Sequence, residues 1–340
     1  MSPAAEDVIR KNAMPVGQAS ASGMKRLFLV VVIVALAAFP LLQVLNGGMN
    51  YWLHMLLFVF MNVAIVSSWN ILGGYTGYIS IGHNVFLAVG GYVSGILFAY
   101  YGISPFLTAP FAGVVAMAFG FVVGMITLRT RGPTFIISTI ALVLLVKITF
   151  DNWDYVGGTN GLSLPLLRLP VDLVKLPFYY GMLIIAIAAV YLSYRVRHSK
   201  LGLGLRAISQ DEIKTEVAGI PTRKYKIVAF ALSCLFVGMA GALWSYYLSY
   251  LRPTIFLSIL VGAKFVLMCI LGGRGTVAGP VIGAIVFIAI NEFFVSVLGS
   301  SELNIVGTGL LLLFALLYFP EGIVGTLKSR NKLPAVLDWD

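Results

Sequence analysis

The segment YKIVAFALSCLFVGMAGALWSYYL, residues 225–248, carries one charged side chain, Lys226. Because about 20 apolar residues in an α-helix cross a bilayer, this segment predicts a transmembrane helix. Working outward in both directions, nine further apolar runs lie at about 27–45, 52–72, 83–101, 106–128, 133–150, 178–194, 256–271, 277–298 and 303–319. The sequence therefore predicts an all-α polytopic membrane protein with about 8–10 transmembrane helices. The runs 83–101 and 256–271 contain glycine or are short, so either could be re-entrant.

Composition excludes most soluble classes. Of 340 residues, 59% are hydrophobic and 11% are charged, whereas soluble domains carry about 25% charged residues. The net charge of +10 does not indicate nucleic-acid binding, because the basic residues lie in short gaps between apolar runs. Cys234 and Cys269 lie within such runs and are interpreted as packing residues, and three scattered histidines predict no metal site.

The distribution of basic residues predicts the orientation. With the N-terminus inside, ten spans place eighteen Lys and Arg residues inside and three outside, namely Arg168, Lys175 and Arg252. We expect a multi-pass membrane protein with both termini cytoplasmic, divided into a disordered N-terminus (1–24), a membrane domain (25–322) and a C-terminal tail (323–340). The run 27–45 could also be a signal peptide, but its length and late start favour a retained span.

The inner connection at 195–224 carries the strongest local signal. Ser209 is the expected N-cap of a helix over 209–220, with Glu212 as its capping-box partner. Ile213, Val217 and Ile220 recur at helical spacing, and Gly219 and Pro221 end the helix. The other face is acidic, whereas helices that lie on lipid are usually basic. The pattern favours docking in a protein groove, with lipid contact as the alternative.

At this connection the sequence resembles the branched-chain amino-acid ABC transporter permeases, in the LivM-like branch. The resemblance rests on the blocks 206–220, 70–83, 131–135, 157–162 and 271–280, which follow one another in the family's order. It implies a type II (BtuC-like) importer fold. It also implies partners: a second permease subunit (LivH-like or identical), two cytoplasmic ATP-binding cassette subunits that bind ATP and Mg, and a periplasmic solute-binding protein. The chain itself would be non-catalytic and without a cofactor.

Three sets of residues are candidates for function. The ATPase-coupling set is Arg206, Ser209, Asp211, Glu212, Ile213, Glu216, Val217, Ala218 and Gly219. A translocation pathway is expected at Gly73, Gly74, Tyr75, Thr76, Gly77, Ser80 and Lys264, because clustered glycines favour a broken helix and an intramembrane charge is a functional candidate. The alternatives are a tight helix crossing for the glycines and a snorkelling side chain for Lys264. Lys264 stands where the family often has Glu. The outer connection 151–177, with Gly158, Thr159 and Asn160, could contact the delivery protein, line the entrance or form an ordinary turn.

These features predict the permease subunit of an importer for a small polar solute, most simply a branched-chain or other amino acid. No G-x-x-x-x-G-K-[ST] motif occurs, so energy must come from a partner or an ion gradient. An ion-coupled secondary transporter is the alternative, although its spans would usually contain more acidic residues. An intramembrane hydrolase using Ser80 and His83 is a third interpretation, which lacks an orienting acid nearby in the sequence. Replacing Glu212 and Glu216 by Lys is expected to uncouple transport.

Overall fold

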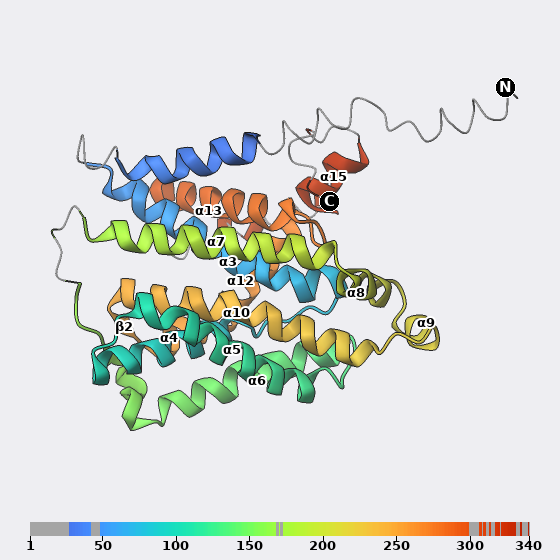
Figure 1. Cartoon of the computed structure of the whole chain (residues 1–340), viewed down its shortest axis with the longest axis horizontal. Coiled ribbons are helices and arrows are strands. Elements are labelled where there is room, and N and C mark those ends of the chain that lie inside the picture. The colour runs from blue at the N-terminus through green and yellow to red at the C-terminus, as the bar shows by residue number, and fades with distance from the viewer. Residues whose placement is uncertain are drawn as a thin grey trace, which may run out of the picture.

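The computed structural model describes residues 27–41, 48–167, 173–298 and 321–330, with a few single positions elsewhere. Within them, eight helical segments are long and apolar enough to cross a membrane. They are α3 (Asn50–Thr76), α4 (His83–Tyr101), α5 (Pro105–Thr127), α6 (Pro133–Asp151), α7 (Lys175–Arg197), α10 (Thr222–Leu248), the broken pair α11 (Pro253–Phe256) and α12 (Ile259–Gly272), and α13 (Ala278–Leu298). The prediction of an all-α protein with 8–10 spans is confirmed. The helices run side by side along the long axis of the molecule (Figure 1).

The first and last predicted apolar runs, 27–45 and 303–319, are described only in part. Residues 27–41 form a helix that is shorter than a full span, and two tyrosines of α7 hold it in place. Tyr179 donates to the carbonyl of Leu36 at 2.7 Å, and Tyr180 donates to that of Ala37 at 3.0 Å. Most of the run 303–319, like the predicted disordered N-terminus 1–24, lies outside the described residues.

Shorter elements cap the two ends of the bundle. One end carries the 3-10 helices η1 (Asp154–Val156) and η2 (Gly158–Asn160), and the antiparallel pair β1 (Leu162–Ser163) and β2 (Tyr250–Leu251). The other end carries α8 (Lys200–Gln210) and α9 (Glu212–Val217). We call these the β1–β2 end and the α9 end (Figure 1). The helix α15 (Gly322–Ser329) packs against α12 and α13, so the first part of the predicted tail is a docked helix.

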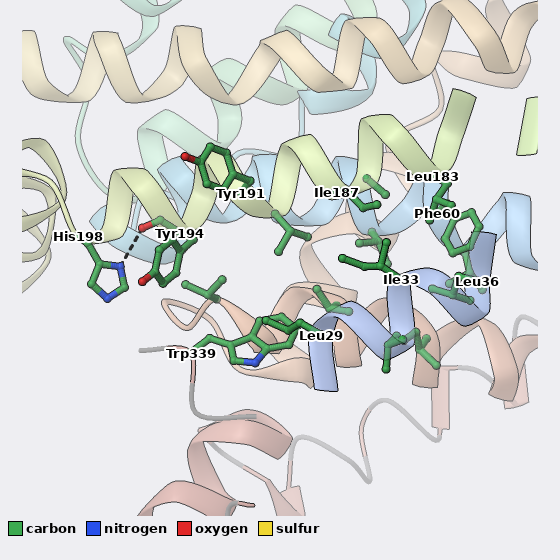
Figure 2. Close-up of a pocket in the computed structure, with 18 residues that line it drawn as sticks. Leu29, Ile33, Leu36, Phe60, Leu183, Ile187, Tyr191, Tyr194, His198 and Trp339 are labelled. Carbon is green, nitrogen blue, oxygen red and sulfur yellow. Dashed lines mark hydrogen bonds between the residues drawn. The ribbon is translucent and has the colours of Figure 1, made fainter. Parts of the chain in front are cut away.

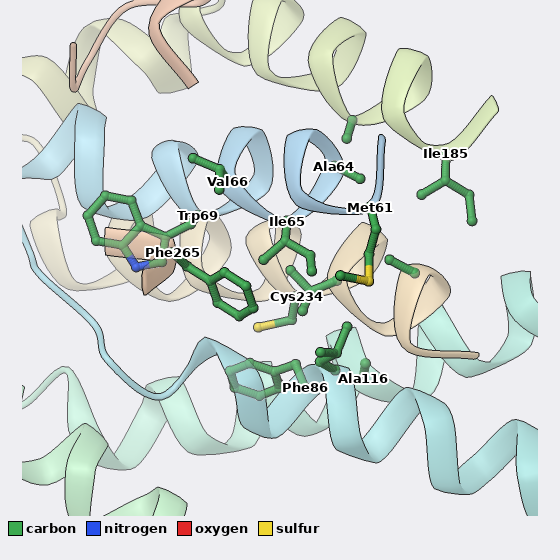
Figure 3. Packing of buried hydrophobic residues seen from close by; sticks show 14 of the residues in the cluster. Met61, Ala64, Ile65, Val66, Trp69, Phe86, Ala116, Ile185, Cys234 and Phe265 are labelled. Carbon is green, nitrogen blue, oxygen red and sulfur yellow. The ribbon is translucent and has the colours of Figure 1, made fainter. Parts of the chain in front are cut away.

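The core lies around α3 and α10. α3 is buried over most of its length, whereas α6 is largely exposed at the edge of the bundle. Trp69 and Ile65 of α3 face Phe86 of α4 and Cys234 of α10, and Phe265 of α12 reaches into the same layer (Figure 3). α4 and α10 approach so closely that a Cβ on Gly90 would lie 2.1 Å from the carbonyl oxygen of Gly238. Small residues thus make the tight crossing here.

Two interruptions in the helices lie next to each other. α3 ends at Gly77, which has a φ of 78°, and residues 77–82 run as an extended connection to α4. The second interruption is at Leu257 and Ser258, between α11 and α12. The buried amide of Asn84 donates to the carbonyls of Phe256 at 3.1 Å and Ser258 at 2.9 Å, which belong to the last residue of α11 and the residue that precedes α12. Asn84 therefore joins the start of α4 to the break in α12.

Candidate coupling surface and transport cavity

The inner connection forms two helices rather than one. α8 begins after Ser199, whose hydroxyl accepts from the Gly202 N–H at 3.2 Å, and continues through Ser209. The prediction that Ser209 is an N-cap is wrong: its hydroxyl donates to the Arg206 carbonyl within α8. Asp211 is extended and caps α9 instead, accepting from the Lys214 N–H at 3.0 Å. That hydrogen bond also holds the pKa of Asp211 below its ordinary value. The Ser-x-x-Glu pattern was present, but burial of Leu205 and Ile208 carries α8 past Ser209.

Glu212 anchors α9 to the membrane helices. Its carboxylate accepts from Lys226 Nζ at 2.7 Å and from the Tyr78 hydroxyl, and Arg131 lies 3.5 Å away. Lys226, in the first turns of α10, is only 2% exposed and also donates to the Tyr78 hydroxyl at 3.0 Å. Burial acts to raise the pKa of Glu212, but hydrogen bonds from Lys226 and Tyr78 outweigh it and the pKa is lowered. We call Tyr78, Glu212 and Lys226, with Arg131 at its edge, the α9 anchor.

The anchor shows what sequence reasoning missed. Glu212 was assigned to a partner-facing surface, but its charge is used inside the chain. Lys226 was interpreted only as one of many inner basic residues, and Tyr78 and Arg131 only as parts of motifs. Their sequence separations from Glu212 range from 14 residues to 134, so no local pattern brings them together.

Two large apolar side chains of α9 are exposed rather than packed in the core. Ile213 is 65% exposed and Val217 is 85% exposed. Ala218 and Gly219 follow them at the surface, and Arg206 and Ser209 are exposed on α8. Glu216 is exposed and lies 3.4 Å from Arg131. The coupling candidates other than Asp211 and Glu212 are thus all exposed, and we call them the coupling surface.

The α9 anchor connects to the interrupted helices through residues 77–82. Tyr78 belongs to this extended segment, whose next residues are fixed by neighbours. The indole N–H of Trp69 donates to the Ser80 carbonyl at 2.7 Å, and the Thr139 hydroxyl accepts from the Ile81 N–H at 3.2 Å. Ile81 then packs on α12, where a Cβ on Gly262 would lie 1.9 Å from the Ile81 carbonyl oxygen. A continuous set of contacts therefore runs from α9 to α12.

The predicted glycine cluster divides between packing and chain reversal. Gly73 accommodates the ring of Trp69, and Gly74 lies against the backbone of Gly275. Gly77 provides the left-handed residue that ends α3. The buried Tyr75 hydroxyl lies 2.8 Å from the Ser193 hydroxyl of α7, and Thr76 donates to the Leu72 carbonyl. These residues and Ser80 do not line the cavity beside Lys264.

That cavity has a volume of about 150 Å³ and lies among α3, α4, α10, α12 and α13. Among the described residues that line it, Lys264 is the one basic side chain, and Asn62 and Asn291 are the amides. The remaining wall is apolar, and it combines aromatic side chains, Trp244 and Phe256 among them, with aliphatic ones and methionine. The structure thus places Lys264 beside a cavity that the glycine cluster does not line, and its role in transport stays a prediction.

A larger groove of about 640 Å³ lies between the helix Leu27–Leu41 and α3, α7 and α13. Its walls are mainly aliphatic, and Tyr191, Tyr194 and His198 gather at one end near Trp339 (Figure 2). It contains none of the predicted pathway residues. Such a surface suits hydrocarbon rather than a polar solute.

At the β1–β2 end, the outer connection is tightly built. A Cβ on Gly161 would lie 2.3 Å from the Leu251 carbonyl oxygen, and the φ of Gly161 is 80°. Gly158 is buried, whereas Thr159 and Asn160 are exposed, and the Asn160 carbonyl accepts from the Tyr250 hydroxyl. The loop is held against the end of α10, and Thr159 and Asn160 are exposed at its tip. Contact of this tip with a delivery protein stays a prediction.

The Ser80–His83 pair has a structural arrangement. His83 is fully buried, with Nδ1 3.0 Å from the Ser80 hydroxyl and Nε2 2.9 Å from the Ser233 hydroxyl. Two serines bond the ring, and no carboxylate orients it as hydrolase chemistry would require. Among the described residues no group of three or more His, Cys, Asp or Glu could hold a metal ion.

Comparisons with known proteins agree with this architecture. Residues 51–319 match the family model described as branched-chain amino acid transport system / permease component. The chain is 26% identical over 338 residues to the high-affinity branched-chain amino acid transport system permease protein LivM of Escherichia coli K12, covering 91% of this chain and 77% of that protein. No solved structure matches the chain.

Two further relatives show the breadth of the similarity. The permease protein LivH of the same Escherichia coli transport system is 26% identical over 283 residues, covering 77% of this chain and 90% of LivH. The ribose import permease protein RbsC of Haemophilus influenzae is 25% identical over 238 residues, covering 66% of this chain and 70% of that protein. With the match over residues 51–319, this multi-pass membrane protein belongs to the family of branched-chain amino acid transport system permease components.

Proposed function

We propose that this permease imports a small solute, an amino acid in the first instance, by alternating access driven by ATP hydrolysis in partner subunits. Two cytoplasmic ATP-binding cassette subunits, which bind ATP and Mg, would hold the coupling surface. A second permease subunit would complete the membrane body, and a periplasmic solute-binding protein would deliver the cargo to the end that carries Thr159 and Asn160. Similarity to both LivM and LivH supports a permease pair, and the names of these relatives support an amino acid cargo.

The observation that carries the proposal is the two-sided structure of α9. One side is bonded to the membrane helices through Glu212, and the other presents Ile213 and Val217 to the exterior of the chain. Because exposed apolar side chains at a helix surface mark interaction sites, a partner that moved this surface would also move α9. The anchor would pass that movement to residues 77–82 and α12.

Orientation follows from charge in this proposal. The basic residues of α8, α9 and the start of α10 lie at the α9 end together with Arg131 (Figure 1). The positive-inside rule assigns that end to the cytoplasm of a bacterial inner membrane. Family membership weighs against the ion-coupled alternative.

The test is a double substitution on the exposed side of α9. Ile213→Glu with Val217→Glu leaves the anchor intact but places two charges in the partner interface. In proteoliposomes with the complete transporter, ATP-dependent uptake should fall at least about tenfold, because burying unpaired charge costs several kcal/mol. The ATPase subunits should no longer co-purify. The control Val217→Ile should behave as wild type, and wild-type uptake by the double variant would refute the proposal.

The double substitution of Glu212 and Glu216 by Lys, which the sequence suggested, is a less specific test of the coupling surface. Because Glu212 is bonded to Lys226 and Tyr78, its replacement by Lys would detach α9 as well as alter the surface. Loss of uptake in that variant would not distinguish docking from folding. Glu216→Lys alone tests the acidic surface and leaves the bonds of Glu212 to Lys226 and Tyr78 in place, since Glu216 is exposed and gives up only its ion pair with Arg131.

A further inference from the structure

The cavity around Lys264 has the size and lining of a ligand site. Its volume of about 150 Å³ equals that of an apolar cavity that accommodates benzene. Phe58, Trp244, Phe265 and Phe287 supply aromatic wall from four different helices. Met61 and Phe265 connect this wall to the packed core seen in Figure 3. The space therefore fits a body of ring size or a short branched chain.

The described wall of the cavity carries a positive charge without a negative one beside it. Within the part of the chain that the structure describes, Lys264 makes no hydrogen bond or ion pair, and no Asp or Glu lines the cavity. Asn62 turns its amide N–H back to the Phe58 carbonyl at 2.8 Å. An ammonium group carries three donors, and an intramembrane cation without a counter-charge is costly. The cavity thus offers one cation with its donors free, beside an apolar wall.

We infer that this cavity binds a small monocarboxylate, with the carboxylate on Lys264 Nζ and the apolar body among the aromatic side chains. As cargo recognition, the inference rests on the proposed transport function. One cation matches one carboxylate, and the wall has too few polar groups for a sugar, whose hydroxyls would lose their hydrogen bonds to water. The shared chemistry of amino acids and simple organic acids is this carboxylate, and the probes below separate the two sources.

The position of the cavity couples it to the rest of the molecule. Phe256 ends α11 at the break that Asn84 holds. Gly262, against which residues 77–82 pack, lies two residues before Lys264. If α9 displaced residues 77–82, these residues would therefore push directly on α12, the helix that carries Lys264.

Calorimetric titration of the purified chain in nanodiscs tests the site with three matched probes. 3-Methylbutanoate and valine share a carboxylate and differ by an ammonium group, and 3-methylbutanamide is the neutral counterpart. The wild type should bind at least one of the two acids. It should bind the amide about 10- to 100-fold more weakly than that acid, because a hydrogen bond to a charged group contributes a free energy of this size. Lys264→Met should lower the affinity for the acid by the same factor, and Lys264→Arg should keep part of that affinity.

The outcomes decide the inference separately from transport. Equal binding of acid and amide, unchanged affinity in Lys264→Met, or no binding of either acid to the wild type would overturn it. Thermal unfolding at the wild-type temperature shows that Lys264→Met is folded. Loss of uptake in the Ile213/Val217 double variant would still support the proposed function if the cavity failed this test, because that variant leaves the cavity untouched.

Discussion

Lys226 and Lys264 are both lysines within helices of the membrane body, and their surroundings differ completely. Lys226 is almost fully buried, donates to Glu212 and Tyr78, and lies 4.4 Å from the centre of the Tyr78 ring. Lys264 is half-buried beside a cavity and has no bonded partner among the described residues. A charge whose partners are supplied by the fold holds the structure together, whereas a charge without them is available to a ligand.

The comparison changes how intramembrane charge is interpreted in this chain. The expectation that such charge is functional singled out Lys264 and passed over Lys226, which lies nearer a helix end. Both are functional in the proposed mechanism, but in different steps. Lys226 transmits the position of α9, and Lys264 recognises the cargo.

The largest effect should come from Lys226→Met. Removing this cation leaves Glu212 and Tyr78 without their buried partner, and such a loss typically costs about 3–5 kcal/mol. Denaturant titration in mild detergent measures the free energy of unfolding. The double variant Lys226→Met with Glu212→Gln should recover part of the loss, because the remaining buried charge is gone. A single variant as stable as wild type would mean that the anchor carries no net stabilisation.

Asn84→Leu should have the next largest effect. The change keeps the branched shape of the side chain but removes both donors from the carbonyls of Phe256 and Ser258. The Ser258 carbonyl keeps the N–H groups of Val261 and Gly262, so the main cost is the loss at the Phe256 carbonyl, about 1–3 kcal/mol for a buried group that loses its partner. We also expect faster amide hydrogen exchange at 257–262, at the start of α12. The matched control is Asn152→Leu, where an exposed amide bonds only the carbonyl four residues earlier in its own helix. Equal exchange in both variants would contradict a role for Asn84 at the break.

The pH dependence of α9 tests the anchor without a substitution. Since the pKa of Glu212 is lowered on folding, its stabilising contribution is complete above the ordinary Glu value of about 4.3 and is lost as pH falls through the lower folded value. Exchange protection of α9 should stay constant from pH 7 to pH 5, after correction for intrinsic rates, and fall only below about pH 4. In Glu212→Gln the protection should be lower, and its fall at acidic pH should shrink to the part that the cap residue Asp211, whose pKa is also lowered, contributes. A transition near pH 6 would indicate a different titrating group.

The sequence predicted the helices better than their contacts. The apolar runs at 52–72, 106–128 and 225–248 correspond to α3, α5 and α10, since a lipid environment imposes a composition that a single sequence reveals. The segment 256–271 was recognised as unusual because it is short, and the structure shows it broken at 257–258. Residues 83–101, the other suspected re-entrant segment, instead form the continuous helix α4.

The site was predicted only in part, for physical reasons. The apolar stripe of Ile213 and Val217 was visible because it depends on spacing along one helix. The cap was misplaced because Ser199, Ser209 and Asp211 are all good capping residues, and tertiary burial of α8 decides among them. The anchor was missed because Tyr78, Lys226 and Glu212 meet only in the folded chain. Whether the coupling surface, the outer loop and Lys264 have their proposed roles stays a prediction.

The smallest effect on stability should come from Lys264→Met. Because Lys264 has no partner to lose among the residues that the structure describes, removing its charge should leave the free energy of unfolding within about 1 kcal/mol of wild type or raise it. Burial of an apolar side chain of similar length replaces a costly cation. Denaturant titration beside Lys226→Met gives the direct contrast between the two lysines. A loss of more than about 2 kcal/mol in Lys264→Met would mean that Lys264 also has a structural partner. The proposed difference between Lys226, which is paired within the chain, and Lys264, which is open to a ligand, would then be wrong. If stability is kept while carboxylate binding is lost, the position is retained for its ligand rather than for the fold.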